Sequence, residues 1–131
     1  MTIYKILLFT ADDVLAHAVS SCLVQSGFKV ILSASGVGST DLIQVEQPTA
    51  VILDIDLPDY NSMAIIRKMR NDITCNRLPV ILIGSNMREE DALIGLEVGA
   101  DLCLRETFHP MVFIARLRSL LRRYESTFSR C

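Results

Sequence analysis

Two pairs of carboxylates stand just after apolar segments of this 131-residue chain. They are Asp54 and Asp56, after the apolar run at 50–53, and Asp12 and Asp13, after the run at 6–9. Carboxylates at the end of a strand can bind a divalent cation, accept a phosphoryl group or act as a nucleophile. Of these four acids, Asp54 follows the most apolar run, so we take it as the centre of any functional interpretation.

Each of these acids also has a purely structural interpretation. Asp54 could cap the turn that follows its strand. Asp12 and Asp13 could be the acids that stabilise the start of a helix through its dipole, rather than metal ligands. The residues alone leave both interpretations open.

Composition limits the kind of protein. A chain of 131 residues forms a single core, half of its residues are hydrophobic, and its net charge is only −2, which argues against disorder and against a nucleic-acid surface. No apolar stretch approaches the ~20 residues that a membrane span needs. Without an export signal at the N-terminus, we expect a cytoplasmic location and free thiols at the four separated cysteines.

Short apolar runs alternate with helical patterns along the whole chain. The runs are Ile6–Phe9, Val30–Leu32, Ala50–Leu53, Pro79–Ile83 and Leu102–Leu104. The helical patterns are Leu15–Leu23 followed by Gly27, Thr40–Glu46 before Pro48, Ser62–Arg70, a helix ending at Val98 with a capping box from Asn86 to Glu89, and a last helix beginning at Pro110. Alternation of this kind predicts an α/β fold, a doubly wound sheet of five parallel strands with five helices on both faces.

In such sheets ligands bind at the carboxyl ends of the strands, where the strand order reverses. We therefore expect a pocket formed by residues at strand ends. Its candidates are Asp12, Asp13, Asp54, Asp56, Gly84, Ser85, Arg105 and Glu106. Arg105 is expected to face away from Asp54, because successive residues of a strand point to opposite faces.

Several local sequences together resemble one family. They are Lys5–Leu8, Gly27-Phe28, Pro48–Asp54, Leu57-Pro58, Leu78–Ile81 and Gly95–Asp101. As a set they resemble the CheY-like receiver domains of two-component response regulators, over residues 5–123. The ending Ala115–Arg123 is similar to the last helix of the OmpR/PhoB subfamily. We therefore expect a receiver domain at 1–123 and, at 124–131, the start of a linker to a C-terminal DNA-binding domain.

The resemblance implies that Asp54 is a phosphoacceptor and that a divalent cation is held by Asp54 and an acidic pair after the first strand. That pair aligns with Thr10 and Ala11 in this chain. The family's switch hydroxyl aligns with Gly84, one place before Ser85, and its lysine with Glu106. The chemistry needed to gather Mg²⁺ and a phosphoryl group is thus replaced at four positions.

These replacements predict an atypical receiver, a signalling and dimerisation module rather than an enzyme, in which phosphorylation of Asp54 is doubtful. Mg²⁺ binding is expected to be weak, and Asp12 would join Asp54 as a ligand only if a local bulge restored the site. The chain would be held near an active-like state, or be switched by a partner or small ligand.

The resemblance also implies partners. OmpR/PhoB receivers form homodimers through the fourth helix, fifth strand and fifth helix, and this surface has candidate ion-pairing residues at Glu97, Asp101, Arg116 and Arg118. Leu102 replaces an acid of the family there, which favours a drier contact. A sensor kinase or another regulatory protein would act on the domain. DNA would be bound only by a further domain, and no membrane contact is expected.

Three other functions remain open from the sequence. The first is a conventional receiver that is phosphorylated at Asp54. The second is a phosphohydrolase of the haloacid-dehalogenase type, because Asp54-Ile55-Asp56 matches its D-x-D motif of nucleophile and general acid. The third is a flavodoxin-like nucleotide binder.

Overall fold

The computed structural model describes residues 3–105 and 109–128. Its strands are β1 Lys5–Phe9, β2 Lys29–Ser33, β3 Ala50–Asp54, β4 Val80–Gly84 and β5 Leu102–Arg105. They form one parallel sheet in the order β2-β1-β3-β4-β5. The helices are α1 Asp13–Gln25, α2 Ser39–Glu46, α3 Ser62–Asn71, α4 Glu89–Val98 and α5 Pro110–Phe128. The predicted doubly wound α/β fold is confirmed.

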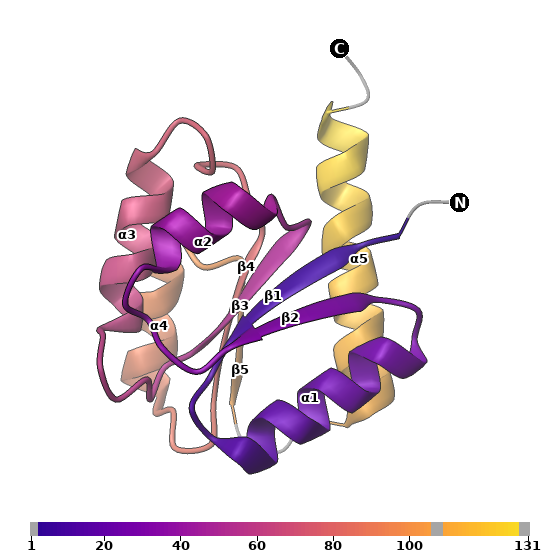
Figure 1. Cartoon of the computed structure of the whole chain (residues 1–131), viewed down its shortest axis with the longest axis horizontal. Helices are drawn as coiled ribbons and strands as arrows, with labels where there is room; N and C mark the ends of the chain where they lie inside the picture. The colour runs from indigo at the N-terminus through magenta and orange to yellow at the C-terminus, as the bar shows by residue number, and fades with distance from the viewer. Residues whose placement is uncertain (1–2, 106–108, 129–131) are drawn as a thin grey trace.

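The sheet lies between two helical layers, with α1 and α5 on one face and α2, α3 and α4 on the other (Figure 1). Alternate residues of one strand supply the two cores. On β1, Ile6 and Leu8 pack toward α1 and α5, whereas Leu7 and Phe9 pack toward the other layer, and all four are fully buried. Each such side chain contributes about 1.5–3 kcal/mol relative to exposure, so burial on both faces explains the continuous apolar run from Ile6 to Phe9.

Two helix ends test the capping signals that were read from the sequence. After α1, Gly27 adopts φ +92°, and the N–H groups of Gly27 and Phe28 donate to the carbonyls of Val24 and Leu23, as a glycine-terminated helix requires. The capping box predicted at Asn86 and Glu89 is wrong. The helix begins at Glu89, and the Arg88 N–H donates to Asp91 Oδ2 at 3.0 Å.

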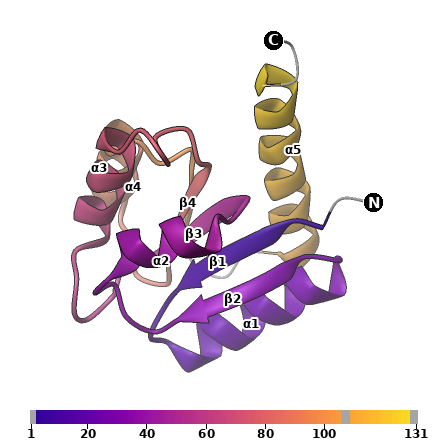
Figure 2. The ribbon, with the colours of Figure 1, turned by 45° about the horizontal axis from the view of Figure 1, so that its top comes forward.

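The last helix, α5, continues to Phe128, beyond Arg123 where we expected the domain to end. Its C-terminal turns run past the sheet at the end where β1 begins (Figure 2). Tyr124 donates from its hydroxyl to Asp101 Oδ1 at 2.8 Å, which ties this part of α5 to the loop before β5. None of the helices in the described ranges is long and apolar enough to cross a bilayer.

Candidate functional site

The strand order reverses between β1 and β3, and the candidate site lies at the carboxyl ends of these two strands. β1 pairs with β3 from Ile6 to Phe9, so the residue after β1, Thr10, lies beside Asp54 at the end of β3. Both are almost fully buried, Thr10 at 2% exposure and Asp54 at 3%. A carboxylate this deep in the fold needs hydrogen-bond donors, and its neighbours supply them.

Both carboxylate oxygens of Asp54 are engaged. The Thr10 hydroxyl donates to Oδ2 at 2.7 Å, and the backbone N–H of Asp56 donates to Oδ1 at 2.9 Å. Ser62, the first residue of α3, donates from its hydroxyl to the Asp54 carbonyl at 2.5 Å. The hydroxyl of Thr10 therefore replaces an acid of the family with a donor, so the charge on Asp54 is satisfied by the protein itself.

Asp12 and Asp13 are acids at the start of helix α1. Asp12 has an extended backbone and is the N-cap of α1, where its Oδ1 accepts from the N–H groups of Val14 and Leu15 at 3.0 and 3.2 Å. Asp13 is the first helical residue and is exposed. The Asp12 N–H also donates to the Thr10 hydroxyl at 3.1 Å, which fixes the turn between β1 and α1.

Asp56 is an exposed acid among other acids. Partial burial raises its pKa, and the negative charges of Asp54, Asp91 and Asp12 raise it further. Ionised Asp56 is thus repelled by its neighbours. A bound cation would relieve this repulsion, which makes the geometry of the acids decisive.

The geometry does not fit the divalent cation that the family implies. Mg²⁺ requires oxygen ligands that converge in a nearly octahedral arrangement. Asp54 has both oxygens engaged and Asp12 has one oxygen committed to the helix cap. Within residues 3–105 and 109–128, no three acids, histidines or cysteines are grouped so that they could hold a metal ion.

The position of the family's switch hydroxyl is filled by a neighbouring side chain. Gly84 ends β4 and is buried, and a Cβ atom added to it would lie 2.4 Å from Ile55 Cγ2. Ser85, the next residue, is exposed. The hydroxyl has therefore been lost together with the space that it would occupy.

Arg105 does not reach toward Asp54. Its Nε donates to the carbonyl of Met87 at 3.2 Å, and its Nη1 lies 3.7 Å from Glu89 Oε1. It thus lies on the side of α4, as expected from strand alternation. Glu106, the other candidate on this loop, lies outside the described residues.

The four residues expected on a dimer surface fall into two groups. Glu97 and Arg116 are exposed on α4 and α5. Asp101 is engaged within the chain, because its Oδ2 accepts from Arg70 Nη2 at 2.9 Å and from the Val80 N–H at 2.8 Å. Arg118 donates to the carbonyl of Ser26 at 2.9 Å. A surface for a partner can therefore draw its charges from Glu97 and Arg116.

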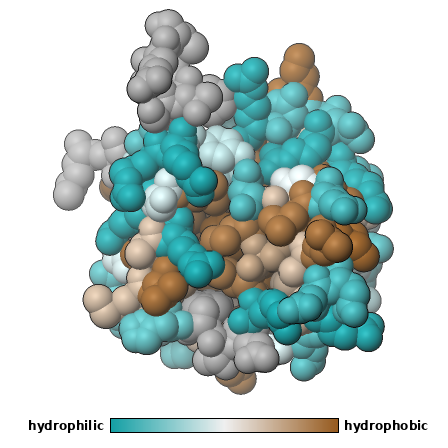
Figure 3. Space-filling model, turned by 180° about the vertical axis from the view of Figure 1, so that it is seen from behind, coloured by the Kyte–Doolittle hydropathy of each residue, from teal (hydrophilic) through white to brown (hydrophobic). Residues whose placement is uncertain are grey.

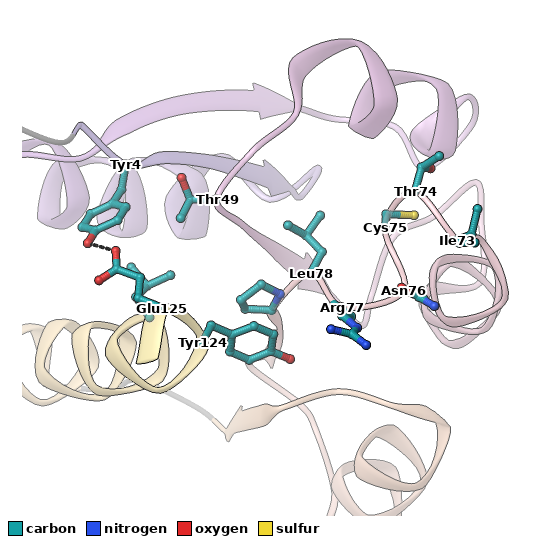
Figure 4. Close-up of a pocket in the computed structure, with 12 residues that line it drawn as sticks. Tyr4, Thr49, Ile73, Thr74, Cys75, Asn76, Arg77, Leu78, Tyr124 and Glu125 are labelled. Carbon is teal, nitrogen blue, oxygen red and sulfur yellow. Dashed lines mark hydrogen bonds between the residues drawn. The ribbon is translucent and has the colours of Figure 1, made fainter. Parts of the chain in front are cut away.

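A groove of about 890 Å³ lies at the opposite end of the molecule, near the amino ends of β1, β3 and β4. Tyr4 donates to Glu125 at one end of it, and Leu78 lies near Tyr124 between the strands and α5 (Figure 4). This groove shares no residue with the surroundings of Asp54.

Sequence reasoning missed the residues that complete the site. Thr10 appeared only as a missing ligand, and its role as a donor depends on its side-chain direction. Ser62 appeared only as the first residue of a helical pattern. Ile55 gave no signal, because its packing on Gly84 depends on how β3 and β4 are paired.

Comparison with known proteins identifies the family of the chain. Residues 6–118 match the family model of the response regulator receiver domain. Transcriptional regulatory protein CseB of Streptomyces coelicolor is 31% identical over 113 residues, which cover 86% of this chain and 47% of that protein. Transcriptional regulatory protein GltR of Pseudomonas aeruginosa is 32% identical over 123 residues, which cover 94% and 51%. This chain spans about half the length of these two relatives.

Among solved structures, the BeF3-activated N-terminal receiver domain of Klebsiella pneumoniae RstA superposes with a TM-score of 0.82 at 29% identity, covering 90% of this chain and 98% of that one. CseB and GltR are named as regulators of transcription rather than as enzymes. The resemblance inferred from the sequence is confirmed, and the chain belongs to the family of response regulator receiver domains.

Proposed function

We propose that this chain is an atypical receiver domain of an OmpR/PhoB-like transcriptional regulator, in which dimerisation does not require phosphorylation of Asp54. The observation that carries the proposal is the hydrogen bond from the Thr10 hydroxyl to Asp54 Oδ2. It satisfies the buried carboxylate within the chain, at the place where the family has a cation ligand.

The energetics favour the resting state of this site. A hydrogen bond to a charged group contributes about 1.5–3 kcal/mol, and it must be broken if Asp54 is to turn toward a cation or an attacking phosphoryl donor. A phosphoryl group adds nearly two negative charges beside Asp56, where Asp12 and Asp91 already repel. The cation at the end of β5, Arg105, is bound to Met87 and Glu89 instead.

The dimer surface in this proposal is formed by α4, β5 and α5. Leu93, Ile94 and Leu96 of α4 are exposed, each at 44% or more. Seen from behind, hydrophobic residues gather across the middle of this face between hydrophilic borders (Figure 3). A hollow of about 210 Å³ between β5 and α5 is lined by Leu102, Arg116, Ser119, Leu120 and Arg123. An apolar strip with a polar rim is typical of a protein interface.

A second copy of the chain is the partner that this face fits. A twofold axis brings the same strip onto itself, so α4 of one protomer would lie against the hydrophobic face of the other. Glu97 and Arg116 lie on the same two helices and carry opposite charges, which suits them for pairing across such an axis. The contact would be more apolar than the ionic contact of the family.

The output of the domain is also part of the proposal. CseB and GltR are named as transcriptional regulatory proteins and are about twice as long as this chain. We infer that a DNA-binding domain acts after the α5 helix and that the receiver sets its pairing. A sensor kinase or another regulatory protein would act on the receiver.

Sedimentation velocity from 1 to 100 µM, in buffer without phosphate donors, tests the proposal. We expect the chain to dimerise and Leu93→Glu to remain monomeric, because the change places a charge in the apolar strip. Val45→Glu, which alters an apolar residue on α2 that is even more exposed than Leu93, is the matched control and should still dimerise. A wild-type chain that stays monomeric throughout, or a control that dissociates as Leu93→Glu does, would refute the proposed surface.

A further inference from the structure

The loop between β4 and α4, residues 85–88, is held at two points that phosphorylation does not touch. One is the side chain of Met87, which is 3% exposed and belongs to the core between the sheet and the α2–α4 layer. The other is the carbonyl of the same residue, which accepts from Arg105 Nε. The loop that leads into α4 is therefore fixed from the inside by packing and from the outside by a cation.

Ile55 closes the site from the side of Asp54. Its Cγ2 lies where a side chain at Gly84 would begin, and the same added Cβ would lie 3.5 Å from Met87 Cβ. A β-branched side chain has little rotational freedom, so Ile55 cannot clear this space without leaving its rotamer. The backbone N–H of Ile55 also donates to the carbonyl of Ile83 at 2.8 Å, and this hydrogen bond fixes the backbone of Ile55 relative to β4.

Arg105 also holds the first residue of α4 in place. Its guanidinium is near Glu89, the first residue of the helix, as well as bound to Met87. The ion pair contributes little because Glu89 is almost fully exposed, whereas the hydrogen bond is made to a carbonyl that Met87 holds in place. Ile55, Met87 and Arg105, from three separate segments of the chain, thus act on the β4–α4 loop.

We propose that Ile55, Met87 and Arg105 form a permanent latch that fixes α4 in one position whatever the charge on Asp54. This rests on the proposed function, since it assigns the regulation of the same site. The family's switch hydroxyl can move, whereas the Cγ2 methyl group of Ile55 that takes its place cannot. The apolar surface of α4 is consequently presented to a partner at all times, and regulation must act by covering that surface or by supplying the partner.

Amide hydrogen exchange of the 131-residue chain tests the latch. Residues 85–98 should exchange at the same rate with and without Mg²⁺ and beryllofluoride, a phosphoryl mimic. Ile55→Ala and Arg105→Ala should each speed exchange in this segment by about tenfold and leave β1 and β3 unchanged, because the opening is local. Val45→Ala and Arg67→Ala, at exposed positions elsewhere, are the matched controls. Equal exchange in the latch variants and in the controls would overturn the proposal.

A double-mutant cycle gives a readout that does not depend on exchange. Gly84→Ala should lower the urea midpoint of unfolding in the wild-type background. The same change should have less than half of this effect together with Ile55→Leu, because leucine lacks the Cγ2 methyl. An equal loss in both backgrounds would contradict the role of Ile55.

The latch proposal and the dimer proposal can be refuted independently of each other. Protection of residues 85–98 that depends on Ile55 and Arg105, in a chain that sediments only as a monomer, would support the latch and refute the dimer. A dimer whose α4 segment is unaffected by either substitution would refute the latch alone.

Discussion

The hydroxyl of Thr10 and the carboxylate of Asp54 form the contact on which the chemistry of this domain depends. Replacing an acid by threonine exchanges repulsion for a hydrogen bond inside the fold. In the proposed atypical receiver, the change removes a cation ligand and gives Asp54 a hydrogen-bond donor in its place. On this proposal, a single residue would turn a cation site into a structural contact.

Changes at Thr10 should separate these two effects. Thr10→Val leaves Asp54 Oδ2 without its donor, and we expect the free energy of unfolding to fall by about 1–3 kcal/mol. Thr10→Ser keeps the hydroxyl, so its free energy of unfolding should fall by less. Urea denaturation measures both, and equal stability of the valine and serine variants would show that the hydrogen bond is unimportant.

Introducing an acid at the same position tests the cation argument. Thr10→Asp puts two carboxylates together, so the variant should be less stable than wild type without Mg²⁺ and should regain stability as Mg²⁺ is added. Wild-type stability should not respond to Mg²⁺ at the same concentrations. A wild-type chain that is stabilised by Mg²⁺ as strongly as the variant would contradict the account.

Asp56 is predicted to oppose folding when it is ionised. Its pKa is raised in the folded state, so protonation favours folding at low pH and this contribution is lost as pH rises through the folded pKa. Asp56→Asn should therefore be more stable than wild type at pH 7, by a few tenths of a kcal/mol because the group is exposed, and should show no advantage at pH 3. Denaturation curves at the two pH values measure this, and a less stable variant at pH 7 would contradict it.

At the scale of the elements, the periodicity of apolar residues was sufficient to predict five strands and five helices. Burial on both faces leaves continuous apolar runs in β1, β3 and β4, and shorter apolar runs mark the edge strands β2 and β5. The start of α4 was missed because Asn86 and Glu89 imitate a capping box, whereas the structure uses Arg88 and Asp91. Arginine is not a preferred N-cap residue, so the cap at Arg88 gave no local signal.

The end of α5 depends on a contact that no local pattern reveals. Asp101 accepts from Tyr124, Arg70 and the Val80 N–H, which come from three separate parts of the chain. The resemblance placed Asp101 on a dimer surface, and the family pattern contains no information about this internal network. Ile55 and Gly84 are similar, since their contact exists only once β3 and β4 are paired.

This network should make stability depend on pH in the alkaline range. Burial, aided by the hydrogen bond to Asp101, raises the pKa of Tyr124 to about 12. The folded state keeps the proton that the unfolded state loses near pH 10, so the contribution is full below pH 10 and is lost as pH rises toward about 12. Tyr124→Phe should cost on the order of 1–2 kcal/mol at pH 8 and progressively less above pH 10. A constant difference from pH 8 to pH 12 would contradict this assignment.

At the scale of the whole molecule, the fold places Asp54 and the C-terminal turns of α5 at opposite ends. Asp54 and the start of α4 lie at the carboxyl ends of the strands, whereas the last turns of α5 lie at the amino ends (Figure 1). The α4–β5–α5 face connects the two ends, and the proposed dimer would use it. If α4 is fixed, this connection is fixed as well, and the domain works as a constant dimerisation module.

The most direct measurement of the central claim is intact-mass analysis of the chain after incubation with acetyl phosphate and Mg²⁺, combined with sedimentation velocity of the same sample. Asp54→Asn is the control for the site of labelling. The account predicts no stable phosphoryl adduct at Asp54 and a dimer that is the same before and after treatment. Mg²⁺-dependent labelling that disappears in Asp54→Asn, together with a change from monomer to dimer, would contradict it.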